Sequence, residues 1–118
     1  MRITVTEDGI ELNSSLEALF WGLCCLFEIP VERSGRAIED GHGGRYAPGF
    51  RVTVAGGTDI WVEAADGRHE DKARRDGRAA LRAASPYRLA VLYPEELRVL
   101  MTRANSYEAY RQLQFWAR

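Results

Sequence analysis

A short basic segment contains the residues best suited to contact a phosphate backbone. Its five cations all lie within residues 72–82: Lys72, Arg74, Arg75, Arg78 and Arg82. On a helix, three of these arginines follow one another at one-turn spacing, which predicts a basic stripe that Arg45 and Arg51 would extend. Such a stripe either contacts duplex DNA through its phosphates or is a solvated helix face whose charge nearby acids offset. The sequence leaves both interpretations open.

Chemistry-bearing residues also occur in a fixed order along the chain. They belong to four segments, each weak as a motif on its own: Ser15-Leu16-Glu17 before an apolar run, Tyr46-x-Pro48-x-Phe50, Trp61-Val62-Glu63-Ala64-Ala65, and Tyr87 to Leu97 after the basic segment. The periodicity predicts a helix for the first of them. It predicts strands for the next two and a strand followed by a helix for the last.

This order resembles that of the PD-(D/E)XK nuclease superfamily, and within it the TnsA-type transposon endonucleases, over about residues 15–97. The resemblance implies a restriction-endonuclease-like α/β core, in which a small mixed sheet is flanked by helices. It implies a divalent metal site, Mg²⁺ or Mn²⁺, to which Glu17 and Glu63 would contribute. It also implies a mobile-element or phage context.

Two departures from the family pattern remove groups that the hydrolysis needs. The metal-binding aspartate of the family falls on Gly49, and the catalytic lysine falls on Ala65. A divalent ion polarises the phosphate and generates hydroxide, and one electrostatic group is often worth about 10²–10³ in rate. We therefore expect a degenerate nuclease, without a cofactor, that binds DNA or a DNA-processing partner.

Two alternative functions remain open. An active metal-dependent endonuclease would use relocated residues, namely Glu17 and Glu63 with Asp66 and Lys72. A structural or assembly subunit would make no DNA contact. The two glutamates also have structural interpretations, because Glu17 stands at capping-box spacing from Ser14 and Glu63 suits a solvated strand end.

The last helix carries aromatic residues that suit either a core or an interface. Tyr107, Tyr110, Leu113 and Trp116 recur at three- and four-residue spacing. They either close the core over the sheet or form a surface for a protein partner or for self-association, since tyrosine and tryptophan anchor interfaces.

The elements that must position these residues follow from periodicity and from helix-start and helix-stop signals. We expect a hairpin over 2–12 and a helix from 14 that ends before Pro30, with Leu19, Leu26 and their one-turn neighbours on its apolar face. Strands follow over 31–62. The basic helix spans about 69–84, with Ala73, Ala80, Leu81 and Ala84 on its apolar side. A strand at 88–92 covered on both faces and two further helices, from Pro94 and from Asn105 or Ser106, complete the chain.

Composition bounds the class of protein. The 118 residues are 46% hydrophobic and 28% charged, typical of one globular domain, 1–118, with no membrane span. The formal net charge is −1, with acidic residues in excess before residue 60 and basic residues in excess after it. The only cysteines, Cys24 and Cys25, are adjacent and are expected to be buried, so no disulfide framework exists. These features predict a cytoplasmic protein.

Overall fold

In the residues that the structure describes, four helices surround one mixed sheet, and two short hairpins stand beside it. The computed structural model describes residues 5–7, 10–12, 14–34, 38–39, 45–53, 59–68 and 70–118. Its elements, in order, are β1 (Val5–Glu7), β2 (Ile10–Leu12), α1 (Ser15–Leu26), β3 (Val31–Arg33), β4 (Ile38–Glu39), β5 (Arg45–Tyr46), β6 (Phe50–Val52), β7 (Ile60–Ala64), α2 (Lys72–Ala84), β8 (Arg88–Leu92), α3 (Pro94–Met101) and α4 (Ser106–Trp116).

The main sheet has the strand order β3-β6-β7-β8. β6 is antiparallel to both of its neighbours, β3 and β7, and its Arg51 lies opposite both Glu32 and Trp61. β8 returns parallel to β7 after α2, so that Glu63 lies opposite Val91. One helix, three antiparallel strands, a second helix and a parallel strand form the α/β core that the sequence predicts.

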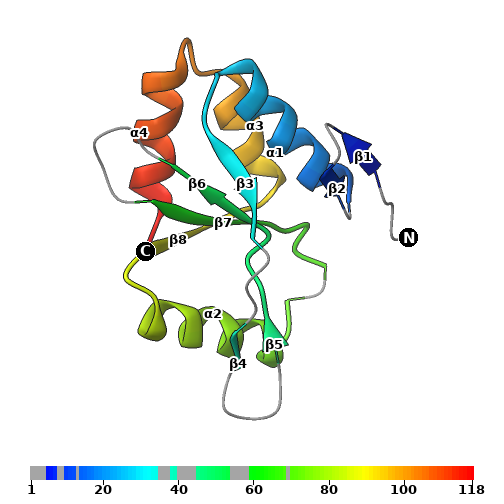
Figure 1. Cartoon of the computed structure of the whole chain (residues 1–118), viewed down its shortest axis with the longest axis vertical. Coiled ribbons are helices and arrows are strands. Elements are labelled where there is room, and N and C mark those ends of the chain that lie inside the picture. Colours follow the sequence, from blue (N-terminus) through cyan, green and yellow to red (C-terminus); the bar gives the residue numbers. More distant parts are fainter. Residues whose placement is uncertain are drawn as a thin grey trace.

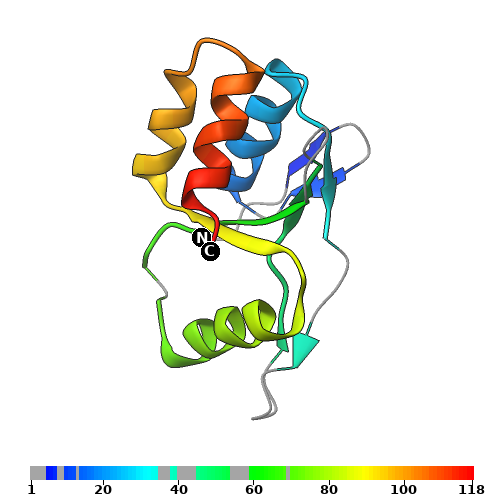
Figure 2. The ribbon, with the colours of Figure 1, turned by 90° about the vertical axis from the view of Figure 1, so that its left-hand side faces the viewer.

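The helices lie in two layers on opposite sides of the sheet. Figures 1 and 2 show α1, α3 and α4 together on one side, and α2 with the β4–β5 hairpin on the other. The larger hydrophobic cluster lies under the three helices and includes Phe20, Phe50, Val62 and Leu113. A smaller cluster of Trp61, Leu81 and Leu89 lies under α2. Alternate residues of β7 therefore face different layers, as the two-residue period of a strand requires.

Local sequence signals account for the helix ends. The side chains of Ser14, Asp71 and Asn105 accept hydrogen bonds from backbone N–H groups in the first turns of α1, α2 and α4. Pro94 occupies the first turn of α3, where its missing N–H has no cost. The predicted caps at Ser14 and Asn105 are confirmed, and the backbone N–H of Glu17 is the group that Ser14 satisfies. The Asp71 cap is not among those predicted, and α2 begins at Lys72 rather than at about residue 69.

The predicted apolar face of α1 is only partly correct. Phe20, Trp21, Leu23 and Cys24 are buried, whereas the Leu26 side chain is 73% exposed. Because α1 is apolar on nearly every side, periodicity alone does not select the packed face. Its neighbours in the fold select it, and they leave Cys25 exposed, so the prediction that both cysteines are buried is wrong for Cys25.

The predicted apolar side of α2 is also wrong in part. Ala73 and Ala84 are exposed, whereas Gly77, Arg78 and Leu81 are buried. The inner face of this helix is built around charged groups rather than around alanines, which an apolar periodicity does not detect.

Gly77 lets α2 approach the β4–β5 hairpin closely. A Cβ atom built on Gly77 would lie 2.5 Å from the Cβ of Tyr46 and 2.7 Å from its Cγ, far inside normal contact distance. No larger residue fits unless the helix or the hairpin moves. This contact fixes the tyrosine beneath α2 and next to the end of β7.

Within the part of the chain described above, no helix has both the length and the apolar character needed to cross a bilayer. Within the region 31–62 where strands are expected, residues 35–37, 40–44 and 54–58 lie outside the described residues.

Candidate functional site

Glu63 lies at the centre of a buried ionic cluster under α2. Its side chain leaves β7 on the α2 side of the sheet, and the residue is only 5% exposed. Arg78 donates from Nε to Oε1 at 2.8 Å and from Nη2 to Oε2 at 2.9 Å. Arg74 donates to Oε2 at 2.8 Å, and the hydroxyl of Tyr46 donates to Oε1 at 2.5 Å. Each carboxylate oxygen thus accepts two hydrogen bonds.

A second acid, Glu70, completes the cluster from the segment before α2. Arg78 donates from Nη1 to Oε2 at 2.6 Å and from Nη2 to Oε1 at 2.8 Å, and the Tyr93 hydroxyl donates to Oε1 at 3.1 Å. One buried guanidinium therefore bridges two carboxylates. This bidentate geometry is the strongest form of a charge-assisted hydrogen bond.

The cluster shifts the pKa values of its members in directions that keep it charged. Burial lowers the pKa of Arg78, but hydrogen bonds to Glu70 and Glu63 and their charges outweigh it and raise that pKa above its ordinary value. Burial and then the adjacent Glu63 charge raise the pKa of Tyr46. Burial and then the hydrogen bond to Glu70 raise the pKa of Tyr93. The tyrosines stay neutral donors and Arg78 stays a cation.

Glu17, the other acid of the family pattern, is also paired with an arginine. Arg33 donates from Nη1 to Oε2 of Glu17 at 2.9 Å and to the carbonyl of Gly49 at 3.2 Å. A Cβ atom built on Gly49 would lie 3.2 Å from that same carboxylate oxygen. Position 49 is therefore adjacent to Glu17, and the Arg33 guanidinium contacts both.

The two glutamates belong to different layers of the molecule. Glu17 lies on α1, on one side of the sheet, and Glu63 faces α2, on the other. In the part of the chain that the structure describes, no group of three or more histidine, cysteine, aspartate or glutamate residues is placed to hold a metal ion. Ala65 is buried, and its N–H donates to Leu92.

The relocated residues of the active-enzyme alternative lie on the surface. Asp66 is exposed and accepts a hydrogen bond from the N–H of Arg68. Lys72 is exposed and pairs with Asp76 one turn along α2 at 2.7 Å. The lysine therefore contacts a carboxylate of its own helix.

The predicted basic stripe divides into an inner and an outer set. Arg74 and Arg78 point under the helix and contact Glu63, so they belong to the ionic cluster. Lys72, Arg75 and Arg82 are exposed on the outside of α2. Arg45 is exposed on β5, in the hairpin that packs against α2. Arg51 pairs with Glu32 and with Asp59 on the neighbouring strand segments. Four of the seven predicted phosphate contacts therefore remain exposed.

The predicted aromatic interface is likewise divided. Leu113 is 1% exposed and belongs to the core, so it cannot contribute to a surface. Tyr110 is half-buried and donates from its hydroxyl to the carbonyl of Thr53. Trp116 is half-buried beside the core, and Tyr107 is 67% exposed. The four residues recur at helical spacing, but only Tyr107 and Trp116 are free to meet a partner.

Sequence reasoning missed three residues of the two ionic sites, whereas it counted Glu70 among the acids that offset the basic helix. Arg33, Tyr46 and Tyr93 lie in strands or in irregular segments and make contacts with residues distant in sequence. None shows a local spacing to its partner. The sequence pointed to a contact only for Arg74 and Arg78. These two arginines lie one turn apart on a helix, and a buried strand beside that helix contains an acid.

Acid should weaken the structure through Glu70. The hydrogen bonds from Arg78 hold the pKa of this carboxyl below its ordinary value of 4.5, while partial burial opposes them and Tyr93 reinforces them. A lowered folded-state pKa means that its contribution to stability is present above pH 4.5 and is lost as the pH falls through the folded-state pKa. Glu70→Gln should therefore be less stable than wild type at pH 7. The difference should close below pH 4.5 in urea titrations, and a difference independent of pH would contradict this assignment.

Comparison of the chain with protein-family models, with curated proteins and with solved structures finds no significant match in any of the three. The resemblance stated from the sequence therefore rests on the residues and on their order.

Proposed function

We propose that this chain is a degenerate PD-(D/E)XK-like nuclease that binds DNA without cutting it. The proposal rests on the contacts of Glu17 and Glu63, the two acids of the family pattern. Arginines pair with both, and the four hydrogen bonds to Glu63 occupy both of its oxygens. A divalent ion at Glu63 would have to displace a guanidinium, and one at Glu17 would lie next to the positive charge of Arg33.

The strand order and the missing groups support the same interpretation. The helix, the three antiparallel strands, the second helix and the parallel strand follow the order that the family resemblance implies. Glycine and alanine stand where the chemistry needs an aspartate and a lysine. Guanidinium groups supply fixed positive charge next to the remaining acids but cannot generate a metal-bound hydroxide.

The outer set of cations supports DNA as the ligand. Lys72, Arg75 and Arg82 lie along the exposed side of α2, with Arg45 on the adjacent hairpin. Cations on one face suit contacts to a phosphate backbone. The two free cysteines suit a reducing compartment, so we place this role in the cytoplasm, in the processing of mobile-element or phage DNA.

A second candidate function is docking to a protein without DNA contact. The exposed aromatic rings of α4 favour it, because Tyr107 is 67% exposed and Phe115 is 82% exposed. Exposed aromatic side chains are typical anchors of protein interfaces.

Two assays on the purified full chain test the proposal. With supercoiled plasmid and Mg²⁺ or Mn²⁺, we expect no nicking by the wild type. With labelled duplex DNA, three phosphate contacts predict that affinity falls about 40-fold between 50 and 200 mM salt. The triple variant Lys72→Ala, Arg75→Ala and Arg82→Ala should lose most of this affinity, whereas Arg98→Ala, an exposed arginine on α3, should not.

Two outcomes would overturn parts of the proposal. Metal-dependent nicking that Glu63→Gln abolishes would make the chain an active endonuclease. Absence of duplex binding at low salt would leave protein docking as the better account.

A further inference from the structure

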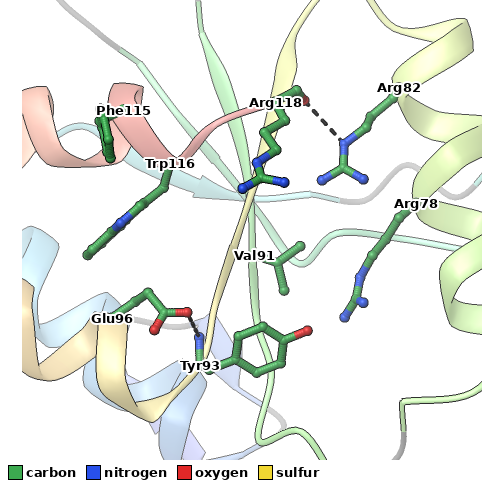
Figure 3. A pocket seen from close by; sticks show the side chains of 8 residues that line it. All are labelled: Arg78, Arg82, Val91, Tyr93, Glu96, Phe115, Trp116 and Arg118. Atoms are coloured by element: carbon green, nitrogen blue, oxygen red, sulfur yellow. Dashed lines mark hydrogen bonds between the residues drawn. The ribbon is translucent and has the colours of Figure 1, made fainter.

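A pocket of about 420 Å³ lies beside the exposed edge of β8. Its floor is Val91. Arg78 and Arg82 line it from α2, and Phe115, Trp116 and Arg118 line it from the end of α4, as Figure 3 shows. Tyr93 and Glu96 line its remaining side. The volume lies in the range of small-ligand sites, about 300–1,000 Å³.

The pocket is lined by two arginines, Arg82 and Arg118, for which no ion pair is seen among the described residues, and by one acid, Glu96. Arg82 donates from Nε to the backbone oxygen of Arg118 at 3.3 Å, and Figure 3 shows the side chains of both arginines at the pocket. No aspartate or glutamate side chain of the described residues lies within ion-pair distance of either group. Arg78, in contrast, is balanced by Glu63 and Glu70. Two adjacent arginines above an open pocket suit an anion that each binds through its planar fork of donors.

Aromatic rings stand next to these arginines. Trp116 packs partly against the core and lines the pocket, and its neighbour Phe115 is 82% exposed. Phosphate-binding arginines beside aromatic side chains are the two components of single-stranded nucleic-acid sites, where bases stack on the rings.

A peptide strand fits this edge less well. The N–H and carbonyl of Leu89 already pair with Arg118 at 2.9 Å each. Because strand pairing repeats every second residue, Val91 is the next position that this edge would offer. A single free position is too short a ladder of backbone hydrogen bonds to hold an added strand. The pocket instead offers arginine and aromatic side chains.

We propose that this pocket binds a segment of single-stranded nucleic acid, with a phosphate between Arg82 and Arg118 and a base on Trp116. The exposed Phe115 beyond Trp116 offers a second stacking surface, so the ligand is a strand rather than a free nucleotide. This inference rests on the proposed function, from which it takes nucleic acid as the ligand. It adds that the nucleic acid is single-stranded and that it binds in this pocket.

The test measures the fluorescence anisotropy of a labelled single-stranded oligonucleotide of about ten nucleotides, with the full chain. Arg82→Ala and Arg118→Ala should each weaken binding and lower the salt slope by about one. Trp116→Leu should weaken binding by about 5- to 150-fold, the effect of losing one stacked base. Arg98→Ala is the matched control and should bind like the wild type.

The outcomes separate this inference from the proposed function. Unchanged affinity in the Arg82→Ala, Arg118→Ala double variant would overturn the pocket assignment, and these exposed positions give a result even if Trp116→Leu fails to fold. Equal loss in Arg98→Ala would also overturn it, since the binding would be unspecific. If a nucleoside monophosphate competed as strongly as the unlabelled oligonucleotide, the assignment of a strand as the ligand would be overturned. Duplex binding through Lys72 and Arg75 without single-strand binding would leave only the proposed function standing.

Discussion

Glu63→Ala is expected to lower the free energy of unfolding by about 3–5 kcal/mol, the cost of removing one partner from a buried ion pair. Arg78 is 7% exposed and would keep only Glu70 as a counter-charge. The donors of Arg74 and of the Tyr46 hydroxyl would lose their acceptor as well. Urea unfolding at pH 7 measures the change directly.

Two further variants identify the origin of that loss. Replacing both partners, as in Glu63→Leu with Arg78→Met, should recover much of the stability, because no unpaired charge then remains buried. Glu32→Ala removes an ion pair to Arg51 in which the glutamate side chain is 57% exposed, and it should cost at most about 1 kcal/mol. If Glu63→Ala cost no more than Glu32→Ala, the buried cluster would not hold α2 to the sheet.

Gly77→Ala should destabilise the protein by about 1–3 kcal/mol, although alanine favours a helix more than glycine does. The added methyl group would lie 2.5 Å from the Cβ of Tyr46. Relief of that overlap must move the hairpin, which carries Tyr46, or the helix, which carries Arg74 and Arg78. Either movement disturbs hydrogen bonds to Glu63. Thermal or urea unfolding measures the loss.

The chain contains its own control for this effect. Gly22 lies within α1, and a Cβ built there meets nothing within 4 Å. Gly22→Ala should therefore stabilise the protein by about 0.5–1 kcal/mol. In a Tyr46→Gly background, which also removes the Cβ that lies 2.5 Å from the added methyl group, the cost of Gly77→Ala should shrink. Equal responses at the two glycines would show that packing against Tyr46 does not decide the outcome.

Local signals in the sequence predict the element order well. Ser14, Pro94 and Asn105 occupy predicted cap or first-turn positions whose chemistry depends only on residues close in sequence. The continuous apolar run 88–92 also predicts the doubly covered β8 correctly. These features need no knowledge of the tertiary fold.

The candidate site depends on contacts that no local pattern contains. Arg33 meets Glu17 across sixteen residues, and Tyr93 meets Glu70 across twenty-three. The same limit explains the wrong side assigned to α2, where the one-turn spacing of the arginines suggested an exposed stripe. Arg78 faces inward because Glu63, on a strand, supplies the charge that its burial requires.

The backbone at Gly49 makes this position resistant to single substitutions. Its φ of +97° strains every residue with a side chain. A side chain there would also approach the Glu17 carboxylate and the Arg33 guanidinium, at 3.2 and 3.4 Å from its Cβ. An aspartate at this position would therefore meet a strained turn and a carboxylate of like charge at once, so its effect depends on what stands at positions 17 and 33.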